Sequence, residues 1–351
     1  MSGVELFGVL GFALAAYAVV ANDSIQTLGT FLSSNQKRSW LVLWAYAGSI
    51  MVVTIAYGYI SGGGDVAFDR LDKLSVLPGE GDRSGWLLPQ AQWWHALPPL
   101  VLLIITRYGI PVSTTFLVLT LFALSGGTAT SGVLTSMLVK SALGYVVAFG
   151  VGTIIWLVIA QTFERWVFRT REELPWPFWV VFQWITTAFL WSQWLMQDLA
   201  NIFVFLPRHV EVVGGETHVS FPLVTVVLGT LLLTAIQGYI FATRGGQIQQ
   251  IVERKVNTVD VRAATIVDLI YGIVLLVFKE VNNIPMSTTW VFLGLLAGRE
   301  LAISYIAALR DRGEAWRDVS GDAGRAFFGL VISIALAFLM PLIGTGRLPQ
   351  F

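Results

Sequence analysis

Two copies of one serine–threonine motif are the residues in this sequence best suited to binding chemistry. The segment GIPVSTT at 109–115 recurs as NIPMSTT at 283–289, and each copy opens an apolar segment. Proline is tolerated in the first turn of a helix, so each motif predicts a new helix that begins near its serine. Free backbone N–H groups and hydroxyls at a helix N-terminus attract anions. We therefore predict an oxyanion site formed by Ser113, Thr114, Thr115, Ser287, Thr288 and Thr289.

Two carboxylates flanked by amides form the second candidate site. The segments NDSIQ at 22–26 and QDLAN at 197–201 each place an aspartate at the end of a long apolar run. A carboxylate there costs roughly 2.5–3.5 kcal/mol unless it is paired, protonated or hydrated. Amides three or four residues away lie on the same helix face, and oxygen ligands suit a hard cation such as Na⁺. The cation-binding candidates are Asn22, Asp23, Gln26, Gln197, Asp198 and Asn201, with Na⁺ at each aspartate as the hypothesis. Protonation of the aspartate, or a helix cap at a break, are the alternatives.

The spacing of these motifs indicates one internal duplication. Asp23 precedes Ser113 by 90 residues and Asp198 precedes Ser287 by 89, while matching positions in the two halves lie 175 and 174 residues apart. We therefore predict two transmembrane repeats, at 1–170 and 171–351. The polar segment 61–92 contains three consecutive glycines and is expected to be an extramembrane loop of the first repeat.

The elements that must hold these motifs are membrane-spanning helices. The chain is 55% hydrophobic and 13% charged with a mean hydropathy of +0.71, whereas soluble domains are roughly 25% charged. A helix needs roughly 20 apolar residues to cross a bilayer. Apolar segments lie near 4–21, 39–60, 93–125, 132–163, 178–206, 220–243, 258–298 and 322–345. The fold class is therefore predicted to be an all-α integral membrane protein.

Loop charges predict the orientation, because cytoplasmic loops carry an excess of Lys and Arg. One side has Lys37, Arg38, Arg165, Arg169, Arg171, Arg244, Arg254, Lys255, Arg262, Arg310, Arg312, Arg317 and Arg325, and the other has Arg70, Lys73, Arg83, Arg208 and Arg347. The first set should be cytoplasmic, with both termini outside the plasma membrane. This assignment requires re-entrant hairpins broken at Pro111 and Pro285. Each half then has three crossings, which makes the repeats inverted, and interrupted helices in matching positions indicate the substrate site.

Several other classes of protein are excluded by what the sequence lacks. It has no cysteine, and its three histidines have no metal-binding spacing, so no cofactor beyond a coupling ion is expected. No basic cluster indicates nucleic acid as a partner. No nucleophile–base pair indicates an enzyme. The roles of Arg107, Lys140, Lys279 and Glu280 and the possibility of a homodimer are left open.

At these motifs the chain resembles the inorganic phosphate transporter (PiT) family of secondary transporters. Its hallmarks are Gly-Ala-Asn-Asp-x-x-Asn and Pro-x-Ser-Thr-Thr-His in each half, and their order and spacing match along nearly the whole chain. The resemblance implies an inverted-repeat fold that couples phosphate uptake to Na⁺ or H⁺. It also implies that Asn22, Asp23, Asp198 and Asn201 line cation sites and that the six Ser and Thr residues hold phosphate.

The chain departs from the family pattern at four positions, as a short and divergent member would. The motif histidine is Phe116 in one half and Trp290 in the other, and Gln26 and Gln197 replace asparagines. The large central cytoplasmic domain of some members is also missing. We therefore expect a cation-coupled phosphate symporter working by alternating access, with sulfate or another small oxyanion as the alternative substrate. A passive anion channel is the alternative from another class, since hydroxyls and helix N-termini also line pores.

Overall fold

The computed structural model describes most of the chain outside the two hairpin regions and the loops next to them. The described residues are 3–72, 86–88, 91–108, 110, 112, 114, 118, 139, 146–147, 149–158, 160–170, 172–173, 176–214, 216–243, 260–280, 288–307 and 311–346. Pro111 and Pro285, where we predict the re-entrant hairpins to turn, lie outside them. The hairpins therefore stay a prediction.

The first part of the chain is helical with one short strand. Its elements are α1 (Gly3–Val19), the π-helix η1 (Val20–Ser24), α2 (Ile25–Ser34), α3 (Trp40–Ser61), β1 (Trp86–Leu88), the 3₁₀-helix η2 (Trp93–Ala96), α5 (Leu97–Arg107), a helix over 149–158, the π-helix η3 (Ala160–Glu164) and α8 (Arg165–Arg169). Two bends interrupt this part: the axis turns by 53° between Leu6–Asn22 and Thr27–Ser34, and by 63° between Phe149–Val158 and Thr162–Arg169.

The second part is also mainly helical. Its elements are α9 (Pro177–Asp198), α10 (Ala200–Phe203), β2 (Arg208–Val213), β3 (Glu216–Ser220), α11 (Leu223–Ala242), α13 (Val261–Glu280), α14 (Thr288–Ala302), the π-helix η4 (Ile303–Ala307) and α15 (Arg312–Thr345). Pro177 is the first residue of α9, a position where its missing N–H has no cost. The chain between α9 and α10 breaks at Leu199, directly after Asp198.

The helices satisfy the expectation of an integral membrane protein with broken helices. In the described residues, three helices are long and apolar enough to cross a membrane, namely Trp40–Ser61, Leu223–Ala242 and Arg312–Gly344. Counting each bent pair as one span raises the number to five. Their outward faces carry large apolar side chains, such as Ile60 and Val224, which is the surface that lipid would cover.

The prediction of an all-α chain is wrong in one region. β1, β2 and β3 form a three-stranded antiparallel sheet in that order, pairing Leu87 with His209 and Val210 with Val219. The segment 208–220 is rich in β-branched residues and turns at Gly214, whose φ of +63° is left-handed. The sheet joins the predicted loop 61–92 to the segment between α10 and α11, so a local pairing outside the apolar segments was missed.

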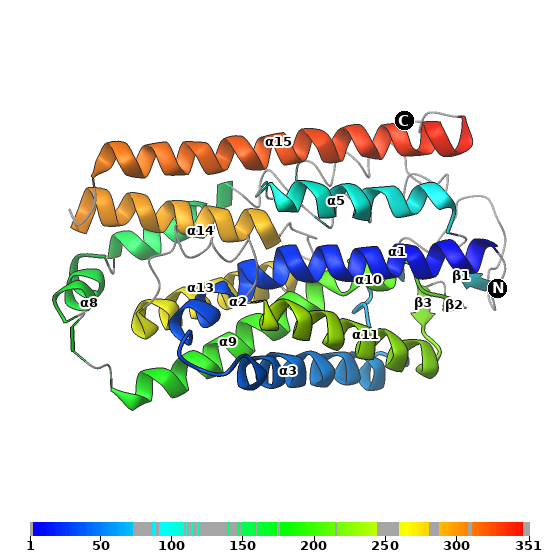
Figure 1. Ribbon diagram of the computed structural model, residues 1–351, viewed down its shortest axis with the longest axis horizontal. Helices are drawn as coiled ribbons and strands as arrows, with labels where there is room; N and C mark the ends of the chain where they lie inside the picture. The colour runs from blue at the N-terminus through cyan, green and yellow to red at the C-terminus, as the bar shows by residue number, and fades with distance from the viewer. Residues whose placement is uncertain are drawn as a thin grey trace.

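The helices lie roughly along one long axis, with the sheet at one end and α8 at the other (Figure 1). We call these the sheet end and the α8 end. α1 begins and α15 ends at the sheet end, whereas α9, α13 and α15 begin at the α8 end (Figure 1). α9 packs along α13, α3 along α11 and α1 along α5, and one large apolar cluster that includes Phe12, Trp191 and Phe203 joins them.

Candidate functional site

The two serine–threonine motifs are in direct contact. The Thr289 hydroxyl donates to the Val112 carbonyl at 3.3 Å, across 177 residues of sequence. Thr114, Thr288 and Thr289 are all buried, so these hydroxyls line the interior rather than the lipid surface. Ser113, Thr115 and Ser287 lie outside the described residues. The structure therefore brings together the parts of the two motifs that it describes.

The second motif lies where α14 begins. Thr288 is the first described residue of α14, and the Tyr271 hydroxyl of α13 donates to its carbonyl at 2.9 Å. Tyr271 is itself fully buried. The contact ties the start of α14 to α13, so the hydroxyls of Thr288 and Thr289 are held on a packed helix rather than on a free loop.

The aspartate cluster of the second half lies at the break between α9 and α10. Gln197, Asp198 and Asn201 are all buried. Asn201 Nδ2 donates to Asp198 Oδ1 at 2.6 Å and to Thr114 Oγ1 at 3.1 Å. One side-chain amide thus joins the candidate cation carboxylate to the candidate oxyanion motif. Gln197 Nε2 instead donates to the Leu275 carbonyl of α13 at 3.0 Å, which fastens the end of α9 to its neighbour.

The aspartate cluster of the first half lies in the π-helix η1, inside the 53° bend. Asn22 is buried, and its Nδ2 makes a long contact of 3.5 Å with the Val112 carbonyl, which Thr289 also contacts. Single π-helical turns occur frequently at functional sites because they interrupt the regular hydrogen-bond ladder. The side chains of Asp23 and Gln26 lie outside the described residues. The described part of this cluster therefore meets the same motif as the second cluster does.

Asp268 is a buried carboxylate that sequence reasoning did not select. It lies on α13 and accepts hydrogen bonds from Thr30 of α2 at 2.5 Å and from Thr187 of α9 at 2.6 Å. Its side chain is fully buried, so the two hydroxyls replace water around it. The signal available in the sequence was a lone acidic residue within the apolar segment 258–298. The structure makes Asp268 the point where three helices of the interior meet.

Arg70 is the second residue that was missed, because the loop charge count places it in a solvent-exposed loop. Instead, the segment 65–72 folds back onto the helices, and Val66, Ala67 and Leu71 are fully buried in the main apolar cluster. A terminal nitrogen of Arg70 is buried and has no hydrogen-bond partner. Burial lowers the pKa of the Arg70 guanidinium, and the carboxylate of Asp198 opposes that shift. Arg70 therefore has a terminal nitrogen inside the protein, although its loop lies outside the spanning helices.

The four charged residues whose roles were left open are not part of the described site. Lys140 lies outside the described residues. Arg107 is the last residue of α5, and Lys279 and Glu280 end α13, but their side chains lie outside the description. Arg299, in contrast, forms a buried ion pair with Glu164, at 2.9 Å between Nε and Oε1. That pair lies beside η3, away from the two motifs.

Comparison with known proteins identifies the fold. No protein-family model matches the sequence, and no curated protein matches it significantly. Among solved structures, the chain is similar to one described as "The sodium-dependent phosphate transporter", with a TM-score of 0.60 and 16% sequence identity. The match covers 99% of this chain and 100% of that chain. The resemblance to the PiT family, predicted from the motifs, is therefore confirmed at the level of the fold.

Proposed function

We propose that the chain is a cation-coupled symporter of inorganic phosphate that works by alternating access. The observation that carries the proposal is the bridge made by Asn201, whose amide donates both to Asp198 and to Thr114. Coupled transport requires that cation binding changes the affinity for the substrate. The Asn201 amide contacts one residue of each candidate site. The fold shared with a sodium-dependent phosphate transporter supports the same substrate and ion.

In this proposal the hydroxyls of the two motifs and the N-termini of the helices that follow them bind the oxyanion. Asp23 and Asp198, with the amides of Asn22, Gln26, Gln197 and Asn201, take up the coupling cation, which is Na⁺ or H⁺. A cation on Asp198 competes with the Asn201 N–H for the carboxylate oxygen. The amide N–H that is freed from Asp198, on a side chain already bonded to Thr114, then becomes available to the bound oxyanion, so cation binding favours substrate binding.

The same proposal includes the orientation and the architecture. We infer that the repeats 1–170 and 171–351 are inverted, and that the α8 end faces the cytoplasm of a plasma membrane. Arg165, Arg169, Arg262, Arg312 and Arg317 all lie in or next to elements at the α8 end, as the charge bias of cytoplasmic loops requires (Figure 1). Both termini then lie outside, and no enzymatic step takes part.

Uptake into proteoliposomes tests this function. Labelled phosphate should accumulate above its equilibrium level when an inward Na⁺ or proton gradient is imposed, and should only equilibrate without one. Thr114→Val, which removes the bridged hydroxyl, should reduce uptake by at least about tenfold, the cost of one lost hydrogen bond to a charged substrate. Thr234→Val is the matched control, because the Thr234 hydroxyl bonds only within α11, to the Thr230 carbonyl at 2.7 Å.

Each alternative has its own result in the same assay. Concentrative uptake of labelled sulfate without phosphate uptake would identify a sulfate permease of the same fold. Phosphate entry that stops at equilibrium under every gradient would identify a passive anion channel. The absence of uptake above empty vesicles under both gradients, with folded protein in the bilayer, would refute phosphate symport.

A further inference from the structure

One short stretch of α13 makes hydrogen bonds to helices of both candidate sites. α13 packs along α9, and it also lies against α2 and α14 (Figure 1). Asp268, Tyr271 and Leu275 follow one another at intervals of three and four residues, so they lie on one stripe of the helix. Asp268 bonds to α2 and α9, Tyr271 to α14, and Leu275 to the end of α9. Two turns of one helix therefore connect the aspartate cluster of the second half to the second serine–threonine motif.

The contact of this stretch with α9 is closely packed. The Gln197 amide of the aspartate cluster donates from Nε2 to the Leu275 carbonyl at 3.0 Å. The carbonyl oxygen of the same amide is the atom that a cation would bind. An added Cβ on Gly272 would lie 2.6 Å from Cδ1 of the Phe189 ring of α9. Because close-packed interiors transmit displacements, a shift at the end of α9 moves α13 as well.

The Tyr271 hydroxyl connects the same stretch to the start of α14. It donates to the Thr288 carbonyl at 2.9 Å, and the Tyr271 ring centre lies 5.8 Å from that of Phe292, one turn further along α14. Tyr271 is 1% exposed and Thr288 is buried too, so bulk water does not replace this bond. The first turn of a helix has fewer internal hydrogen bonds than its middle. The hydroxyl therefore holds the part of α14 that carries the motif.

The two serine–threonine motifs are connected to the aspartate cluster of the second half in different ways. Asn201 joins Thr114 of the first motif directly to Asp198. The second motif is joined to the same cluster through α13, by the bonds that α13 makes with Gln197 and with Thr288. A side-chain amide thus serves the first motif, and a whole helix with one tyrosine hydroxyl serves the second.

We propose that Tyr271 is a positioning residue that makes oxyanion binding at the second motif depend on cation binding at the aspartate cluster of the second half. The inference rests on the proposed function, since it takes these to be the substrate and cation sites. Cation binding orders Gln197 and the end of α9, α13 follows, and the Tyr271 hydroxyl places the first turn of α14. Without the hydroxyl, the N–H groups and hydroxyls that bind the oxyanion are no longer held to α13.

Thermal unfolding of the purified full chain in detergent measures this coupling without any transport. Phosphate is titrated in Na⁺ and in choline at constant ionic strength, and at two pH values to compare H⁺. A ligand that binds only the folded state raises the unfolding temperature, so each titration gives an apparent phosphate affinity. The ratio of the affinities with and without the cation is the coupling factor.

Tyr271→Phe keeps the buried ring and removes only the hydroxyl. It should lower the coupling factor at least about threefold, the effect of one lost hydrogen bond of ordinary strength. The cation affinity measured without phosphate should stay within about twofold of the wild type, because no cation ligand has changed. A loss of stability alone would not produce this split between the coupling factor and the cation affinity.

Tyr46→Phe is the matched control. The Tyr46 hydroxyl makes the same kind of bond, to the Trp184 carbonyl, and joins α3 to α9. Tyr46→Phe should lower the unfolding temperature and leave the coupling factor unchanged. If Tyr271→Phe fails to fold, Phe292→Leu takes its place, because it loosens the Tyr271 ring and should lower the coupling factor in the same direction.

The outcomes separate this inference from the proposed function. An unchanged coupling factor in Tyr271→Phe, or in Phe292→Leu where that replaces it, overturns this inference alone. An equal loss in Tyr46→Phe does the same, as does a cation affinity that weakens equally without phosphate. A wild type that responds to sulfate but not to phosphate refutes phosphate as the substrate, and the role of Tyr271 is then decided by the same titrations with sulfate. A wild type that binds neither oxyanion, or binds one without any response to Na⁺ or H⁺, refutes the proposed function and this inference together.

Discussion

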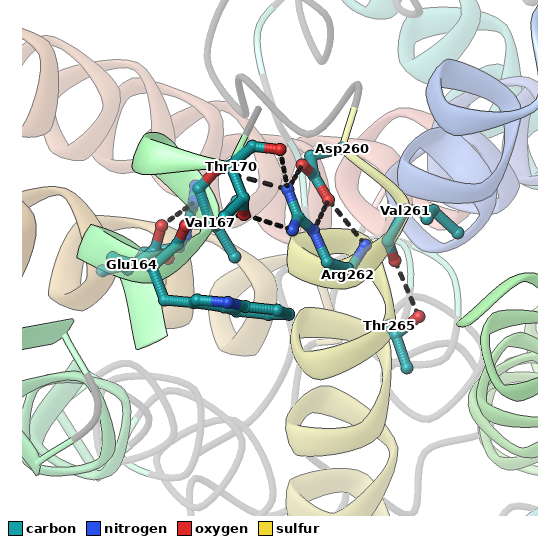
Figure 2. Close-up of polar contacts among 9 residues, drawn as sticks. Glu164, Val167, Thr170, Asp260, Val261, Arg262 and Thr265 are labelled. Atoms are coloured by element: carbon teal, nitrogen blue, oxygen red, sulfur yellow. Dashed lines mark hydrogen bonds and ion pairs between the residues drawn. The ribbon is translucent and has the colours of Figure 1, made fainter. Parts of the chain in front are cut away.

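At the α8 end, the Arg262 guanidinium donates to Asp260, to the Thr170 hydroxyl and to the Val167 and Thr170 carbonyls (Figure 2). It also lies 4.6 Å from the centre of the Trp166 ring. At the sheet end, Arg70 keeps a buried nitrogen with no such partner. Arg262 therefore connects the end of α8 to the start of α13, whereas Arg70 has a terminal nitrogen without a hydrogen-bond partner.

A second arginine joins two elements at the α8 end. Arg299 of α14 contacts both carboxylate oxygens of Glu164 in η3, at 2.9 and 3.2 Å, and lies 5.3 Å from the Trp156 ring. η3 and η4 are in contact beside this pair. The buried pair thus joins η3 to α14, two segments that are far apart in sequence.

The largest predicted effect comes from breaking the buried Arg299–Glu164 ion pair. Arg299→Gln leaves the Glu164 carboxylate buried without its cation, which should cost about 3–5 kcal/mol of unfolding free energy. Equilibrium unfolding of the wild type and the variant in detergent measures this loss of unfolding free energy. The double variant Arg299→Met/Glu164→Leu removes both charges and should cost clearly less than Arg299→Gln. Equal losses in the single and double variants would show that packing, rather than charge pairing, stabilises this end.

The next prediction concerns the backbone contact that holds Arg299 in place. Gly298 crosses the helix 149–158 so closely that an added Cβ would lie 2.6 Å from the Thr153 backbone nitrogen. Gly298→Ala should therefore destabilise the protein by about 1–3 kcal/mol through overpacking. Gly321→Ala is the matched control, because no atom lies within 4 Å of its Cβ and alanine favours the helix by about 0.5–1 kcal/mol. A Gly298→Ala variant as stable as the control would mean that the two helices can separate at little cost.

The contrast between the two ends also shows which parts of the structure could be predicted from the sequence. The apolar runs predicted α3, α11 and the α9–α10 segment closely, because a membrane helix is specified by length and hydropathy. The repeated motifs predicted that Thr114 and Thr289 share a neighbourhood, and both contact residues of the other half. The repetition of the motif made this prediction possible, because a single Ser-Thr cluster does not indicate which other segment lies beside it.

The inward turn of Arg70 could not be predicted in this way. Loop charge counts assume that a charged loop residue faces water, and nothing in 65–72 marks the left-handed turn at Phe68 and Asp69. The sheet was missed for a related reason: β1 pairs with a strand 122 residues away in the numbering, and such long-range pairing leaves no local pattern. The sequence shows Asp268 as an acidic residue within an apolar segment. Its partners Thr30 and Thr187 could not be predicted, because they lie on two other helices.

The smallest predicted effect belongs to the sheet end and concerns Asp72. Burial, together with the neighbouring Asp65, raises the pKa of the Asp72 carboxyl from 3.8 to about 6. The folded state therefore binds more protons than the unfolded state between about pH 4 and 6, so stability contributed by Asp72 falls as pH rises through that window. Relative to Asp72→Asn, which keeps the acceptor for the Val219 N–H, the wild type should gain thermal stability from pH 7 to pH 5. The gain should be small, because the side chain is partly solvated and its field is screened. If the two proteins instead show parallel pH profiles, Asp72 is ionised in the fold throughout, and the loop that carries Arg70 is more open to water than its contacts indicate.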